Sequence, residues 1–239
     1  MIVGLVTAGL LVLLAVVAAG AGVRAYRSER GPRPFSRTGR HYRRLCTRRS
    51  FLRLGAATVA AAALANSGVD QAVAGAYAAR VHGPRVDALS AGWKGFGERF
   101  WFFVWGVFAM LDGLLVSTPL LRWGRGNFEA MIVGLPVLWT AQRVGGASRP
   151  SEERGARWRP FADDNTASGH TFMAAVPLLT LRADIRHQVG RGALWLASWG
   201  TGWSRLHDRK HFLSQVIYGH AIAAAAVEAV GTDVRDPDA

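Results

Sequence analysis

Cysteine and acidic residues are scarce in this 239-residue chain. The single cysteine, Cys46, excludes an internal disulfide. Only 16 aspartates and glutamates stand against 29 lysines and arginines, which gives a formal net charge of +13. Eleven arginines and one glutamate lie between Arg24 and Arg53, so this segment alone carries +10 of that charge. The rest of the chain is close to balanced, and we therefore expect no general nucleic-acid binding.

Charge is absent from residues 1–23, a nearly continuous apolar run. About 20 such residues are enough to cross a bilayer as a helix. A signal peptide carries its positive charge before the apolar core, whereas here the charge follows it, so a retained anchor is favoured. Because cationic flanks stay on the cytoplasmic side, this helix is predicted to run from outside to inside. Residues 1–53 are interpreted as a membrane anchor with an arginine-rich cytoplasmic linker, and residues 54–239 as a helical membrane domain.

A second N-terminal signal competes with this interpretation. Thr47-Arg48-Arg49-Ser50-Phe51-Leu52 looks like a twin-arginine export signal, and the Ala63-Leu64-Ala65 that follows resembles a cleavage site. If translation starts downstream of Met1, this segment would be a cleaved leader. If it starts at Met1, residues 54–79 are more simply an Ala-rich helix that returns to the outside, which is the reading we favour.

Further apolar runs are separated by arginine-rich turns. They predict an all-α, multi-pass membrane helix bundle with spans near residues 100–121, 130–141, 169–181, 192–203 and 212–230. The third and fourth of these runs are short for a span. Asp112 lies inside the first, where a carboxylate is costly and is expected to have a role or a hydrogen-bonded partner.

The polar residues between these runs form three blocks in a fixed order. They read Gln142 to Arg149-Pro150, then Ala167-Ser168-Gly169-His170, then Ser204-Arg205 to His211 and Gln215. Two arginines can neutralise a phosphate through their planar donor forks. If a helix begins near Ser168 and Gly169, its free N–H groups point at the same anion, and two imidazoles can supply a nucleophile and an acid.

At these blocks the chain resembles the type 2 phosphatidic acid phosphatase family, the lipid-phosphatase branch of a superfamily that also contains soluble acid phosphatases and vanadium haloperoxidases. The family pattern is Lys, six residues, Arg-Pro; then Pro-Ser-Gly-His; then Ser-Arg, five residues, His, three residues, Asp. The spacing is kept, with Gln142 in place of Lys, Ala167 in place of Pro and Gln215 in place of Asp. The resemblance covers roughly residues 96–230.

The resemblance implies roles for the matching residues. His211 would attack phosphorus to form a phosphohistidine, and His170 would protonate the departing oxygen. Gln215 would hold the His211 ring through its amide oxygen, without the negative charge of the family's aspartate. Asp208 is a candidate source of that missing charge. The remaining residues of the blocks would bind phosphate: Arg149, Arg205, Ser168, Gly169, Gln142 and Ser204.

We therefore expect a membrane lipid phosphate or diphosphate phosphatase that uses no metal and no cofactor. Its substrate would stay in the cytoplasmic (inner) membrane, with the active site at the outer or periplasmic face. Two alternatives stay open. One is an exported soluble acid phosphatase or vanadate haloperoxidase, and the other is a catalytically weak or inactive protein that binds lipid phosphates, motivated by Gln142 and Gln215. The oligomeric state stays open as well.

Overall fold

The computed structural model describes residues 35–114 and 118–235, and the anchor expected at residues 1–23 lies outside these ranges. The described residues contain helices and no strand. In chain order the helices are α2 (Thr38–Leu45), α3 (Arg48–Asn66), α4 (Val69–Arg80), α5 (Pro84–Lys94), η1 (Gly95–Gly97), α6 (Phe100–Leu114), α7 (Pro119–Gly145), η2 (Pro150–Glu152), α8 (Gly169–Asp184), α9 (Gln188–Ala197), α10 (Gly200–His207) and α11 (Leu213–Arg235).

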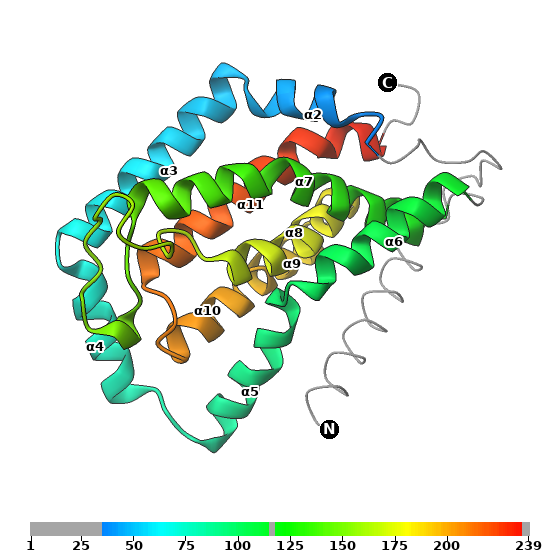
Figure 1. The fold of residues 1–239 in the computed structure, drawn as a ribbon. Coiled ribbons are helices and arrows are strands. Elements are labelled where there is room, and N and C mark those ends of the chain that lie inside the picture. Colours follow the sequence, from blue (N-terminus) through cyan, green and yellow to red (C-terminus); the bar gives the residue numbers. More distant parts are fainter. Residues whose placement is uncertain (1–34, 115–117, 236–239) are drawn as a thin grey trace.

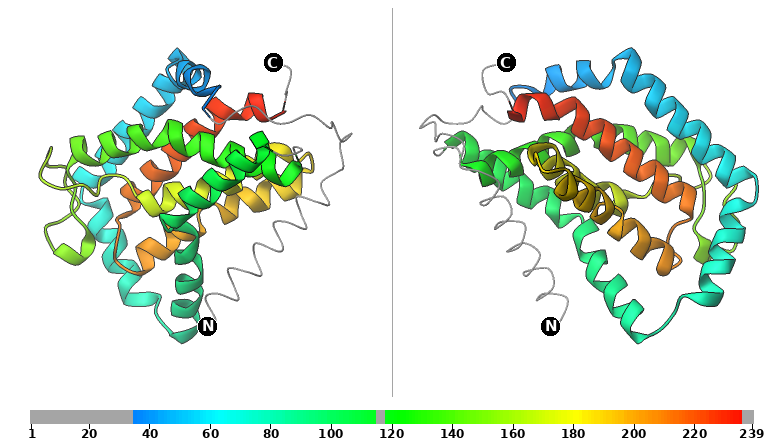
Figure 2. Two further views of the ribbon diagram at one scale, coloured as in Figure 1. Left: turned by 45° about the vertical axis from the view of Figure 1, so that its right-hand side comes forward. Right: turned by 180° about the vertical axis from the view of Figure 1, so that it is seen from behind.

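The core of the protein forms where α7, α8 and α11 pack against one another (Figure 1). Phe172 of α8 is fully buried there, and its ring lies over Gly134 of α7, where any larger side chain would collide with it. Burial of one such side chain contributes about 1.5–3 kcal/mol. Helices α3, α4 and α5 follow one another around the edge of this core, as the view from behind also shows (Figure 2).

The expected helices are present, but their boundaries differ from those predicted. The run at residues 54–79 is two helices, α3 and α4, bent by 67°. The bend falls at Gly68, which has a φ of 86° and so adopts the left-handed conformation that glycine tolerates. The run at residues 192–203 is likewise divided between α9 and α10.

Threonine and proline begin a new helix inside the apolar run predicted at residues 100–121. Helix α6 ends at Leu114, and α7 begins at Pro119, with the Thr118 hydroxyl accepting a hydrogen bond from the Leu121 amide. A threonine cap followed by proline at the first position is a strong signal for a helix start. Helix α7 then continues for 27 residues and includes the predicted run at residues 130–141.

Part of the arginine-rich segment, which the sequence predicted to be a solvated or headgroup-bound linker, is folded against the bundle. Helix α2 buries His41 and Leu45, and the Tyr42 hydroxyl donates to the carbonyl of Ile132 in α7 at 2.8 Å. Arg53 of α3 pairs with Glu228 of α11. The apolar and aromatic residues of this short helix share one face, which lets the arginines lie at its edge and outside. The boundary predicted at residues 53 and 54 falls inside α3.

Asp112 has the partner that its position requires. Its carboxylate lies 2.8 Å from Nε of Arg125 in α7, and both side chains are buried. Removing one member of such a buried pair leaves an uncompensated charge, at a cost of about 3–5 kcal/mol. The contact joins α6 to α7, which supports a packing role for Asp112.

Among the described residues, one helix is long and apolar enough to cross a membrane by itself. It is the Leu213–Gly231 part of α11, and the bent pair of α3 and α4 would be a second candidate. Helix α6 is apolar but shorter. One face of α6 is exposed and carries large apolar side chains at helical spacing: Phe100, Phe103, Val107, Met110 and Leu114. The multi-pass arrangement therefore stays a prediction.

Candidate active site

The three sequence blocks meet where four helices begin or end. Arg149 follows α7, His170 is the second residue of α8, Arg205 lies in the last turn of α10, and His211 lies just before α11. The charges of Arg149, His170 and Arg205 all lower the pKa of His211, so the three side chains lie near it. Arg122 and Arg125 lie in the first two turns of α7 and Arg182 lies in the last turn of α8, at the helix ends opposite to those next to Arg149 and His170.

His211 is held by Gln215. Nδ1 of the ring lies 2.8 Å from Oε1 of Gln215, and Nε2 of Gln215 donates to the carbonyl of Ser148 at 2.7 Å. Because that amide nitrogen is used by Ser148, the oxygen faces the ring, so Nδ1 of His211 carries the hydrogen. Nε2 of His211 is left as the basic nitrogen, and in the described part of the chain no hydrogen-bond partner is found for it. An imidazole in this tautomer is a competent nucleophile.

The same environment keeps His211 neutral. Burial lowers its pKa to about 3, although the Gln215 hydrogen bond opposes the shift, and the nearby Arg149, His170 and Arg205 lower it further. A neutral ring retains the lone pair that an attack on phosphorus requires.

Two arginines are oriented by fixed partners that leave part of each guanidinium free. Nε of Arg149 donates to Oδ1 of Asn165 at 2.7 Å, which leaves its two terminal nitrogens available. Nη2 of Arg205 donates to Asp208 at 2.5 Å and to the Ser204 hydroxyl at 3.0 Å, whereas its buried Nε has no hydrogen-bond partner. A buried donor of this kind on a guanidinium is suited to an anionic acceptor.

Ser168 caps the N-terminus of α8. Its side chain accepts hydrogen bonds from the amide and from the hydroxyl of Thr171, and its own amide donates to the carbonyl of Gln215 at 2.9 Å. The amides of Gly169 and His170 occupy the first two helical positions, which have no carbonyl partner within the helix. These amides and the positive end of the helix dipole make a site for an anion.

His170 differs from His211 in its exposure. Its side chain is about one-third exposed (34%), and its Nε2 lies 3.9 Å from a carboxylate oxygen of Glu98. Burial and then the charge of Arg205 lower its pKa, while Glu98 opposes them. A dianionic phosphate beside the two arginines would raise the pKa of His170 again and favour its protonation.

The other predicted site residues, Gln142, Ser204 and Asp208, make hydrogen bonds within the protein. Nε2 of Gln142 donates to the carbonyl of Ala167 at 2.8 Å, so Gln142 supports the turn that leads into α8. Ser204 bonds to Arg205 and to Ser90 of α5. Asp208, the candidate charge for His211, is instead bound to Arg205 and Ser90.

Sequence reasoning missed Asn165, Ser148 and Ser90. Each lies outside the spaced blocks or contributes only a carbonyl oxygen, so its role depends on contacts between distant parts of the chain. Asp163, five residues before the Ser168 cap, accepts a hydrogen bond from Arg154. The acidic residue that approaches His170 is Glu98, 72 positions earlier in the chain.

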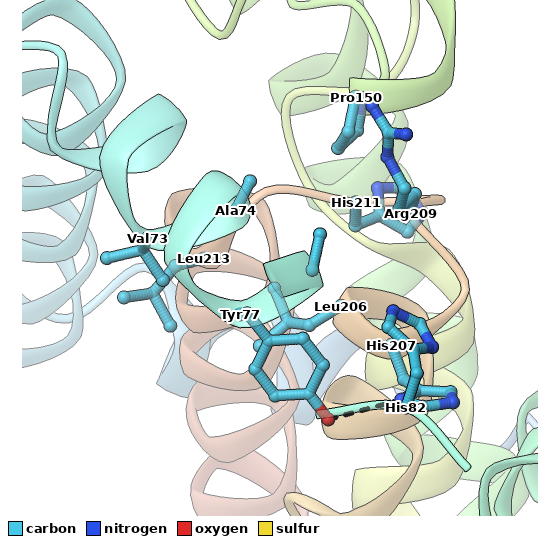
Figure 3. Close-up of a pocket in the computed structure, with 11 residues that line it drawn as sticks. Val73, Ala74, Tyr77, His82, Pro150, Leu206, His207, Arg209, His211 and Leu213 are labelled. Carbon is cyan, nitrogen blue, oxygen red and sulfur yellow. Dashed lines mark hydrogen bonds between the residues drawn. The ribbon is translucent and has the colours of Figure 1, made fainter. Parts of the chain in front are cut away.

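A small pocket opens beside His211 (Figure 3). Its lining joins Pro150 and His211 at one end to Tyr77, His82 and His207 at the other. A second pocket, which is almost wholly apolar, lies between α6 and α8.

The described residues form a helical fold in which two histidines and two arginines from the three blocks are grouped at the helix ends. Residues 126–235, which include all three blocks, match the family described as the PAP2 superfamily. This match supports assignment of the chain to the type 2 phosphatidic acid phosphatase superfamily, and with it phosphoester hydrolysis as the activity. Searches of curated proteins and of solved structures gave no match.

Proposed function

We propose that the protein is a membrane phosphatase that removes phosphate from a lipid at the outer face of the cytoplasmic membrane. The observation that carries the proposal is the arrangement around His211. Its ring is neutral, one nitrogen is fixed by Gln215, and Arg149, Arg205 and His170 surround it.

The reaction would proceed in two steps. Nε2 of His211 attacks phosphorus, the bond from phosphorus to the ester oxygen breaks, and His170 gives its proton to the departing oxygen. His170, now neutral, then takes a proton from water, which attacks the phosphohistidine and releases inorganic phosphate. Arg149, Arg205 and the amides at the start of α8 would stabilise the charge on the transferring group in both steps.

The apolar pocket between α6 and α8 supports a lipid as the leaving group. Ala174, Pro177 and Leu178 line it from α8, four, seven and eight residues after His170, so they share a face of the helix with the proposed acid. Trp101 and Trp105 of α6 form part of the opposite wall. A hydrocarbon chain attached to the departing oxygen would lie in this pocket, along the face of α8 that carries Ala174, Pro177 and Leu178.

The exposed apolar face of α6 and the length of α11 support a membrane location. Phosphatidic acid, phosphatidylglycerol phosphate and polyprenyl diphosphates all fit this description. Oligomeric partners are not part of the proposal.

The test is phosphate release from these lipids by the full-length protein in detergent, with EDTA present. Wild type is expected to release phosphate, and His211→Gln is expected to lose activity by on the order of 10³-fold or more. His187→Gln, which changes an exposed histidine just before α9, is the matched control and should keep wild-type activity.

A second candidate function follows from the uncharged Gln142 and Gln215, which would suit a protein that binds lipid phosphates without hydrolysing them. Binding of the same lipids by wild type, with no phosphate released by wild type or by Gln215→Asp, would establish that candidate and overturn the enzyme.

A further inference from the structure

A cluster of metal-binding side chains lies at the end of the His211 pocket away from the nucleophile. His82 comes from the connection between α4 and α5, Asp87 from the first turn of α5, and His207 from the last turn of α10. Each offers one ligand atom, and the three atoms lie within 4.8 Å of one another. Figure 3 shows His82 and His207 side by side, with Tyr77 against them.

The separations in this cluster suit a small ion. Nε2 of His207 lies 2.7 Å from Oδ1 of Asp87, and Nδ1 of His82 lies 3.8 Å from the same oxygen. Around a tetrahedral Zn²⁺ with bonds of about 2.0 Å, two ligand atoms are about 3.3 Å apart. To bind the ion, the separation between His207 and Asp87 must therefore widen, and that between His82 and Asp87 must shorten, each by about half an ångström. Asp87 and His82 are both exposed, so their side chains are free to make this adjustment.

The ring of His207 is already oriented for such a ligand. Tyr77 accepts a hydrogen bond from Nε1 of Trp203 at 2.8 Å, and its hydroxyl lies 3.2 Å from Nδ1 of His207. The Tyr77 oxygen has two lone pairs, so it can also accept the hydrogen of Nδ1, and Nε2, which faces Asp87 and His82, can then give its electron pair to a metal. A hydrogen bond to the second nitrogen of a histidine is the usual support for a metal-bound ring.

We propose that His82, Asp87 and His207 form a binding site for a divalent transition metal of the Zn²⁺ type, with its fourth position open to water from the pocket. Two histidines and one carboxylate with one open position are a common ligand set for zinc. The ion would join the α4–α5 segment to the end of α10, four residues before His211. This site is separate from the proposed phosphatase chemistry, which needs no metal.

The experiment uses full-length protein in detergent, with any histidine tag removed and any metal stripped by EDTA and then dialysed away. Co²⁺ is added as the probe, because a four-coordinate Co²⁺ site gives strong visible absorption, and Zn²⁺ is added to displace it. Wild type should bind one Co²⁺ with that absorption and release it to Zn²⁺.

His82→Ala and Asp87→Asn should each weaken binding roughly 100-fold. Both positions are exposed, so the variants are expected to fold, and helical circular dichroism checks this. His187→Ala, another exposed histidine, should bind as wild type does. Zn²⁺ should also raise the Tm of wild type and not that of His82→Ala, because an ion that binds only the folded state stabilises it.

Absence of the four-coordinate absorption in wild type would overturn the proposal. So would equal binding by wild type, His82→Ala and Asp87→Asn. Because metal binding is measured without any lipid, this result is independent of whether the protein hydrolyses phosphate.

Discussion

Oε1 of Gln215 lies 2.8 Å from Nδ1 of His211 and also accepts the amide hydrogen of Phe212 at 3.1 Å. One oxygen thus fixes both the ring and the backbone at the start of α11. The amide nitrogen of the same side chain is bound to Ser148, so Gln215 cannot rotate to present its nitrogen to the ring without breaking that bond.

Replacing Gln215 by methionine should slow phosphate release by roughly 100-fold, because the His211 tautomer is no longer selected. Gln215→Asp should instead raise kcat, since a carboxylate stabilises the cationic phosphohistidine. It should also lower stability by about 1–3 kcal/mol, because the carbonyl of Ser148 loses its donor. The measurement is kcat and Tm for the three proteins. A faster methionine variant would contradict the role given to Gln215.

Asn165→Ala should raise KM about tenfold and change kcat little, because Asn165 orients Arg149 without touching the substrate. Steady-state kinetics on one lipid phosphate measures the split between the two constants. Asn165→Asp keeps the acceptor for Nε of Arg149 and should recover most of the affinity. If Asn165→Ala leaves KM unchanged, the fixed guanidinium of Arg149 is not part of the phosphate site.

The folded protein should lose stability as the pH falls below about 6.5. The pKa of His211 is about 3 when folded, whereas a free histidine titrates near 6.5, so the unfolded chain binds the proton more tightly between these values. The His211 contribution is complete above pH 6.5 and declines by up to about 1.4 kcal/mol per pH unit towards pH 3. Tm measured between pH 7 and pH 5 should fall less steeply for His211→Gln than for wild type or His187→Gln. Parallel curves for all three would contradict the buried neutral ring.

Ala174→Leu should discriminate lipids from small esters. The added side chain enters the apolar pocket between α6 and α8 and leaves the arginines and His211 untouched. The kcat/KM for a long-chain lipid phosphate should fall at least about tenfold, while that for a small soluble phosphate ester should stay within about twofold. Ala193→Leu, exposed on α9, is the control. An equal fall in kcat/KM for both substrates would show that this pocket does not bind the lipid chain.

Lysines on the exposed face of α6 should disturb membrane association. Phe103 and Met110 are 70% and 56% exposed, and a charge in the bilayer centre costs about 3 kcal/mol. Wild type should stay with membranes after an alkaline wash, whereas Phe103→Lys combined with Met110→Lys should be released or degraded. Gln71→Lys combined with Gln188→Lys, which changes two exposed polar residues, is the control. Recovery of wild type in the soluble fraction without detergent would support the exported soluble alternative.

Local spacing made the central part of the site predictable. The contact between His211 and Gln215 follows from a four-residue separation, although His211 itself precedes α11 and is not inside it. The Ser168 cap and the start of α8 at Gly169 likewise follow from small and polar residues next to an apolar run. Both features depend on residues fewer than five positions apart.

Features that depend on distant contacts were not predictable in this way. The sequence suggested Asp208 as a charge for His211 and gave Asn165 no role. Their contacts with Ser90 and Arg149 appear only when α5 and the segment after α7 are placed beside them. The folded α2 is a similar case. Its arginines predict a solvated segment, and its burial of His41 depends on packing against α7 and α11.

The carbonyl of Arg205 accepts the amide hydrogens of both Lys210 and His211, at 2.9 Å and 3.2 Å. Arg205, proposed to bind phosphate, and His211, proposed to attack it, therefore belong to one short closed turn of the chain. If the helices span a bilayer and tilt when its thickness changes, the two residues should move together as one piece. The protein should accordingly keep its chemical rate constant across lipids of different chain length, and bilayer thickness should act on how the substrate reaches the site.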